Sequence, residues 1–89
     1  MERSEVIKTI NDFLIDEFEM SPDDIVLEDN FHEALDLDSL DYVDLVVVIQ
    51  NQFGFKLSAE NFVGVNTFEE FYNMIEEQLR IYTQEQENA

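Results

Sequence analysis

The sequence predicts a small all-α fold, a four-helix bundle with three main helices, one short helix and a long first loop. Hydrophobic residues make up 45% of the 89-residue chain, which is enough for one compact core. Two glycines and one proline leave few sites for the tight turns of an all-β domain. We expect a single domain over residues 1–82, followed by a polar, frayed tail over 83–89.

The first helix is expected over residues 3–18 because apolar side chains recur there at three- and four-residue spacing. Ser21 and Pro22 then predict the start of a helix, with Ser21 as the N-cap and Pro22 as the first helical residue. This helix is expected to have no more than one turn. A long connection follows to about Asp38, and connections of that length tend to be functional or mobile. The apolar stripe of the first helix is Val6, Ile10, Phe13, Leu14 and Phe18.

The second helix is expected to begin at Asp38, whose carboxylate can cap the free amides, with Asp41 at the third helical position. The β-branched run over 46–49 does not indicate a strand, because the apolar positions continue in helical register to Phe53. Gly54 is a suitable residue to end this helix.

The residue pattern in the last part of the chain predicts one short and one long helix. Residues 58–61 suggest a short helical turn that Gly64 breaks. Thr67 and Glu70 have the spacing of a capping box for the last main helix. The stripe of that helix is Phe68, Phe71, Tyr72, Ile75 and Leu79.

The second helix carries two apolar stripes at about 100° per residue. One stripe faces the core, and the other, with Asp44 beside it and Asp41 at its flank, lies nearly opposite. Either the long connection covers this second stripe, or the stripe is a docking strip, apolar in the middle and acidic at the edge, for a basic partner. The core stripe is Tyr42, Leu45, Val46, Ile49 and Phe53; the second is Leu40, Val43 and Val47.

The charge balance favours protein partners over nucleic acid or membranes. Four basic residues oppose 22 acidic ones, a net charge of −18 that repels polyanions, steers basic protein surfaces and opposes self-association. We therefore expect a monomer. The absence of cysteine excludes disulfides and thiolate metal sites. No apolar run is long enough to cross a bilayer and the first residues lack a signal-peptide pattern, so a cytoplasmic protein is expected.

Asp38-Ser39-Leu40 stands at the expected start of the second helix, and in isolation a serine there is ordinary capping chemistry. Its setting is a long loop with Phe31 and Leu35 as anchors, and after it an apolar helix with an acidic edge. In this setting the chain resembles the acyl carrier protein family from about residue 5 to residue 79. The resemblance implies that a phosphopantetheinyl transferase, using coenzyme A and magnesium, attaches 4′-phosphopantetheine to Ser39, with Asp38 and Leu40 beside it.

The same resemblance implies a carrier and not an enzyme: the thiol of the arm carries acyl groups between partner enzymes of fatty acid, polyketide or related lipid synthesis. Those partners load, elongate or transfer acyl groups and offer basic surfaces to the docking residues. The docking residues are Asp38, Leu40, Asp41, Val43, Asp44 and Val47. The implied acyl pocket consists of Phe31, Leu45, Val46, Ile49, Leu57, Phe62, Val65, Phe68 and Phe71.

The chain departs from the family pattern at three places. Asp36 stands where the family usually has glycine, and residues 50–52 (Gln-Asn-Gln) stand where fatty-acid carriers are often acidic. Phe62, Phe68 and Phe71 fall where relatives often have smaller residues. They predict a narrower, more aromatic acyl pocket, unless neighbouring side chains shift to keep the usual volume.

Three other functions compete with the carrier. An EF-hand loop counted from Asp36 places Leu40 at its fifth position and Asp41 at its sixth, where an oxygen ligand and glycine are needed. A serine hydrolase lacks support because the one histidine, His32, is expected in an exposed loop and no nucleophile-elbow motif is present. The alternative left open is an unmodified acidic adaptor or inhibitor of a basic partner, and it differs from the carrier in whether Ser39 is modified.

Overall fold

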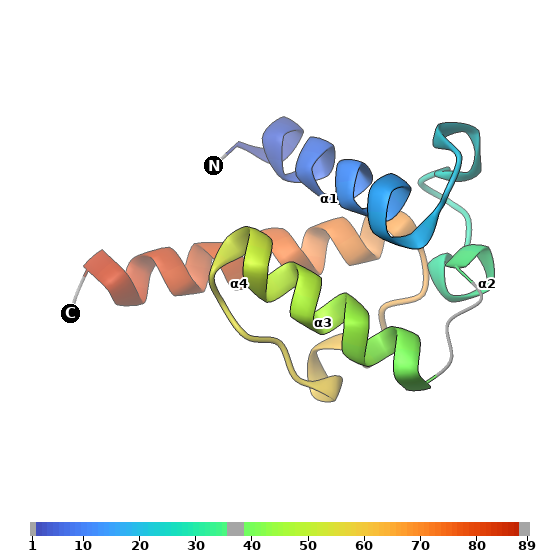
Figure 1. Ribbon diagram of the computed structural model, residues 1–89. Helices are drawn as coiled ribbons and strands as arrows, with labels where there is room; N and C mark the ends of the chain where they lie inside the picture. Colours follow the sequence, from blue (N-terminus) through green and yellow to red (C-terminus); the bar gives the residue numbers. More distant parts are fainter. Residues whose placement is uncertain (1, 36–38, 88–89) are drawn as a thin grey trace.

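The computed structural model describes residues 2–35 and 39–87, with the backbone alone for residues 39, 59, 86 and 87. The regular elements of this described part are all helices, with no strand among them, so the all-α prediction is confirmed. Figure 1 shows the long helices packed together, with the short elements in the connections between them. The elements are α1 (Arg3–Phe18), η1 (Pro22–Asp24), α2 (Phe31–Leu35), α3 (Ser39–Phe53), η2 (Ala59–Phe62) and α4 (Phe68–Glu87).

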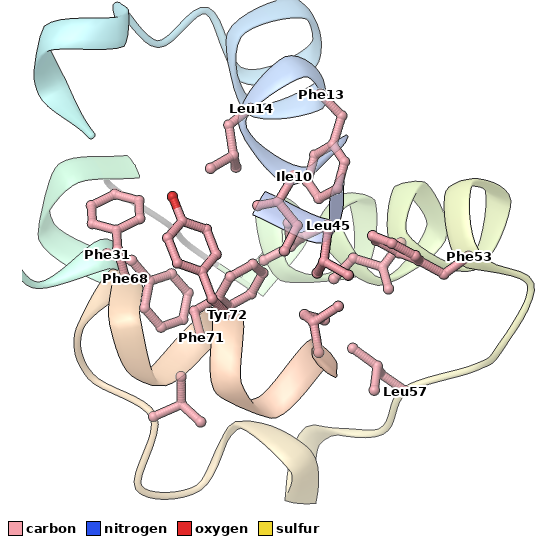
Figure 2. Packing of buried hydrophobic residues seen from close by; sticks show 14 of the residues in the cluster. Ile10, Phe13, Leu14, Phe31, Leu45, Phe53, Leu57, Phe68, Phe71 and Tyr72 are labelled. Carbon is pink, nitrogen blue, oxygen red and sulfur yellow. The ribbon is translucent and has the colours of Figure 1, made fainter. Parts of the chain in front are cut away.

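Helices α1 and α4 lie side by side and run in opposite directions (Figure 1). The guanidinium of Arg3 on α1 donates to Glu76 at 2.5 Å and to Asn73 at 2.8 Å, both on α4. Between these helices and α3 the buried apolar side chains form one core (Figure 2). Ile10 of α1, Leu45 of α3 and Ile75 of α4 are each fully buried there.

Helix α1 covers the predicted residues 3–18 and ends in a left-handed residue. Glu19 has a φ of 57°, an angle that few residues other than glycine adopt easily. The turn sends Met20 back toward the core, where it is 7% exposed. Pro22–Asp24 then forms one 3₁₀ turn, as the sequence predicts.

The long connection before α3 contains a helix that the sequence analysis missed. Helix α2 has five residues and is too short for a periodic pattern to show. Two contacts with the start of α4 hold it: the amide of Phe31 donates to the carbonyl of Asn66 at 2.9 Å, and the amide of Phe68 donates to that of Asp29 at 3.1 Å. The ring of Phe31 is buried against Phe71, 4.9 Å between centroids.

Helix α3 begins at Ser39 and ends at Phe53, and Gly54 follows with a φ of 88° that suits glycine. The expected cap, Asp38, lies outside the described residues. A short 3₁₀ turn, η2, follows where a helical turn was expected, with Ser58 donating its amide to the side chain of Asn61 at 2.9 Å. Gly64 comes after η2 with a φ of 81°.

Helix α4 begins with the predicted capping box. The amide of Glu70 donates to Thr67 Oγ1 at 3.1 Å, and the amide of Thr67 donates to Glu70 Oε1 at 3.1 Å. The helix continues through Glu87, so residues 83–87 are helical where a frayed tail was expected. Glutamine and glutamate there favour helix, and the side chains over 83–85 are exposed. The domain boundary at residue 82 stays a prediction.

Candidate functional site

The head of α3 is the first part of the candidate site. Ser39 is the first residue of the helix, so its amide belongs to the first turn, where amides have no acceptor within the helix. The positive end of the helix dipole also lies there. Leu40, the next residue, is 75% exposed. The side chain of Ser39 and the whole of Asp38, both predicted site residues, lie outside the described part.

The outer face of α3 is apolar and open. Val43 is 60% exposed and Val47 is 48% exposed, in line with Leu40, whereas Leu45 and Ile49 on the opposite face are fully buried. The interpretation in which the long connection covers this second stripe is therefore wrong. The connection instead packs α2 against the start of α4, through the backbone bonds of Phe31 and Phe68. We call Leu40, Val43 and Val47 the outer stripe.

An acidic hollow of about 450 Å³ lies on one side of the outer stripe. It brings Glu17 at the end of α1 close to Asp41 and Asp44 of α3, so the edge of the stripe carries carboxylates from two helices. Within the described residues, no group of three or more histidine, cysteine or carboxylate side chains is placed to hold a metal ion. The hollow is lined by Glu17, Phe18, Asp41, Asp44, Val47, Val48, Asn51 and Gln52.

A larger, mostly apolar groove of about 690 Å³ lies on the other side of the stripe, between α3 and η2. Val46 and Phe62 are the predicted pocket residues that line it. Phe31, Leu45, Ile49, Phe68 and Phe71 are at most 1% exposed within the core, and Leu57 and Val65 are also buried. The groove is lined by Tyr42, Val43, Val46, Val47, Gln50, Lys56, Phe62 and Val63.

Tyr42 forms one wall of the groove, and His32 holds it in place. The hydroxyl of Tyr42 contacts Nδ1 of His32, and Nε2 of the same ring lies 3.1 Å from the carbonyl oxygen of Val65. The bonds are both satisfied when Nε2–H donates to Val65 and the Tyr42 hydroxyl donates to Nδ1. The ring of Tyr42 also meets Phe62 edge-on, 5.6 Å between centroids.

The place of His32 corrects a prediction. It was expected in an exposed loop, but it is a half-buried residue of α2 that links α2, α3 and the segment before α4. Gln50 and Lys56 at the groove were also missed. Nothing in the local pattern marks them, because their place depends on how the chain from Gly54 to η2 folds back along α3.

A family model described as "Phosphopantetheine attachment site" matches residues 8–75, a span that includes Ser39, α3 and the groove. The chain belongs to the acyl carrier protein family. It is 32% identical to an acyl carrier protein of Coprothermobacter proteolyticus over 89% of this chain and 96% of that protein. It is 28% identical to an acyl carrier protein of Petrotoga mobilis over 91% of this chain and 95% of that protein. It is also 28% identical to an acyl carrier protein of Thermosynechococcus vestitus over 84% of this chain and 93% of that protein.

The family resemblance expected from the sequence is therefore confirmed, and with it the cofactor, a covalently attached 4′-phosphopantetheine. The residues at the head of α3 fit such a group. The first-turn amides and the helix dipole favour the phosphate, and the exposed Leu40 marks this end of the helix as accessible to solvent. When bound, the group supplies the thiol that this cysteine-free chain lacks. No helix among the described residues is long and apolar enough to span a membrane.

Proposed function

We propose that this chain is an acyl carrier protein in which Ser39 holds the 4′-phosphopantetheine arm. The observation that carries the proposal is the position of Ser39 within the family match, as the first residue of a helix whose outer face is left uncovered. In the modification, the serine oxygen forms a new bond to the phosphorus next to the pantetheine of coenzyme A. The bond from that phosphorus to the adenosine bisphosphate breaks, and the serine proton leaves.

The outer stripe and its acidic edge support a docking role for α3. A partner with Lys or Arg around an apolar centre would match Asp41 and Asp44 beside Val43 and Val47, and Asp38 is a further proposed docking residue. The proposed partners are the phosphopantetheinyl transferase and the enzymes that load, elongate or transfer the acyl group. The net charge of −18 supports a monomer that meets each partner in turn.

The chain itself is proposed to perform no catalysis. His32 is committed to Tyr42 and Val65 and is not presented to a nucleophile. We place the carrier in the cytoplasm, where it takes part in fatty acid, polyketide or related lipid synthesis. Residues 50–52 (Gln-Asn-Gln) favour a role outside the housekeeping fatty acid pathway. The narrow, aromatic acyl pocket stays a prediction: Val46 and Phe62 line the groove beside α3, whereas Phe68 and Phe71 lie within the core.

Intact mass spectrometry tests the proposal. The protein is incubated with coenzyme A, magnesium and broad-specificity transferases, and the wild type is expected to gain the mass of one arm. Ser39→Ala is expected to gain none, whereas Ser4→Ala, a control at an exposed serine of α1, gains one arm like the wild type. No gain by the wild type with several transferases would instead support the acidic adaptor, which uses the same outer stripe without modification.

A further inference from the structure

The groove beside α3 has an electrostatic character unlike the rest of the molecule. The chain has 22 acidic residues, yet none of the residues that line this groove is acidic. Its floor and walls are valines and aromatic rings, and its polar side chains are those of Tyr42, Gln50 and Lys56. An anionic group is repelled by the molecule as a whole but meets a cation and no lining carboxylate here.

Lys56 is also the one lysine or arginine side chain in the described part that has no ion-pair partner. Arg3 pairs with Glu76 at 2.5 Å and Lys8 with Asp12 at 2.9 Å. The fourth cation is similarly occupied, since Arg80 lies 2.5 Å from Glu77. In so acidic a protein, an ammonium without a carboxylate neighbour is left available to a bound anion.

The backbone around Lys56 sets the direction of its side chain. Phe55 and Leu57, on either side, are buried at 6% and 3% exposure, while Lys56 is exposed. This alternation is that of an extended segment with one face on the core, and it turns Lys56 away from the core. Lys56 and Gln50 both line the groove. Gln50 lies two turns beyond Tyr42, about 12 Å farther along α3 from Ser39, so this is the end of the groove far from the head of the helix.

We propose that this groove binds an acyl chain that ends in a carboxylate, with the methylenes against the valines and the distal carboxylate at Lys56. The inference rests on the proposed function, because the chain is carried on the arm of Ser39. Val46, Val47 and Val63 supply the apolar surface, and the Lys56 ammonium and the Gln50 amide supply donors at the far end. An acyl chain that ends in a methyl group gains nothing from Lys56.

The test compares a suberyl chain, labelled at its distal carboxyl, with an octanoyl chain on the same arm. Loading is verified by intact mass, and NMR then follows the backbone amides of Val46, Val47 and Val63 and the titration of the distal carboxyl. Lys56→Met and Lys8→Met have the same net charge, but Lys8 lies on α1, outside the groove. Because the Lys56 ammonium favours the ionised carboxylate, the titration midpoint of the distal carboxyl is expected to lie about half a pH unit or more higher in Lys56→Met than in Lys8→Met.

Equal midpoints in the two variants would overturn the role of Lys56, and suberyl loading that leaves the groove amides unshifted would overturn the site itself. Lys56→Gln serves as a second variant if Lys56→Met folds poorly. If no transferase adds an arm, the proposed function fails, but the inference is still tested. Ser39→Cys then supplies the single thiol of the chain, and a suberyl chain is attached to it chemically through a spacer of the same length as the arm, for the same titration.

Discussion

The hydroxyl of Tyr72 on α4 donates to Oδ1 of Asn11 on α1 across 2.5 Å. Tyr72 is 1% exposed, so this bond satisfies the polar end of a side chain that is otherwise enclosed by the core (Figure 2). Burial raises the pKa of Tyr72, and the bond to Asn11 and the charge of Arg3 oppose that rise without cancelling it. Ionisation of Tyr72 at high pH is therefore expected to weaken the contact between α1 and α4 and to lower the stability of the fold.

Tyr72→Phe is expected to lower the free energy of unfolding by about 1 kcal/mol at neutral pH, because it removes one hydrogen bond and leaves Asn11 without its donor. The raised pKa of Tyr72 contributes stability that is present below the unfolded value of about 10 and is lost as the pH rises through the folded value. The wild type should thus lose more stability than Tyr72→Phe between about pH 9 and pH 11. Urea unfolding at several pH values measures both effects.

Tyr82→Phe is the matched control, since Tyr82 is a half-exposed tyrosine near the end of the same helix. Tyr82→Phe should lose as much unfolding free energy at alkaline pH as the wild type does. An alkaline loss of equal size in Tyr72→Phe and the wild type would contradict the assignment to Tyr72.

The three long helices could be predicted from the sequence because each buries its own stripe. Ile10, Ile49 and Ile75 stand at helical spacing in their segments and are all fully buried, so periodicity alone locates α1, α3 and α4. The capping box of Thr67 and Glu70 likewise depends on residues three apart. Local patterns succeed where local contacts decide the structure.

Helix α2 and the groove could not be predicted in this way because long-range contacts decide them. The bridge between Asn30 and Thr67 joins residues far apart in sequence and helps to fix α2. Lys56 lines the groove only because Phe55 and Leu57 are buried beside it. The predicted pocket was carried over by resemblance and named mostly core residues.

The contact between Tyr42 and His32 is expected to stabilise the packing of α2 on α3. Tyr42→Phe leaves Nδ1 of His32 without its donor and should cost about 1 kcal/mol of unfolding free energy. A double-mutant cycle with His32→Ala, measured by urea unfolding, should give a coupling energy of about 0.5–1.5 kcal/mol. Strictly additive losses would show that the two side chains do not act together.

Thr67→Ala is expected to destabilise the start of α4. The substitution removes the oxygen that accepts the amide of Glu70, and loss of a threonine cap costs about 1 kcal/mol. Hydrogen exchange should show faster opening of the first turn of α4. Thr83→Ala, an exposed threonine within α4, is the control and should leave both quantities nearly unchanged. Equal stability of Thr67→Ala and the wild type would contradict the cap.

Reversing the charge at the edge of the outer stripe is expected to slow modification while the fold persists. Asp41→Lys with Asp44→Lys replaces two carboxylates of α3 by ammonium groups, which repel a basic partner at the place where it docks. The rate of arm attachment at low ionic strength, followed by intact mass, should fall about tenfold or more. The difference from the wild type should shrink as salt is added, because screening weakens both the attraction and the new repulsion.

The control for this change is Glu5→Lys with Asp16→Lys, two exposed residues of α1 that line neither the groove nor the acidic hollow. It alters the net charge by the same amount, so it separates docking on α3 from the general field of the molecule. If the two double variants lose the same rate, the long-range field alone guides the transferase and the outer stripe has no special part. A loss confined to the α3 variant, with circular dichroism unchanged, locates docking beside Val43 and Val47, next to the serine that receives the arm.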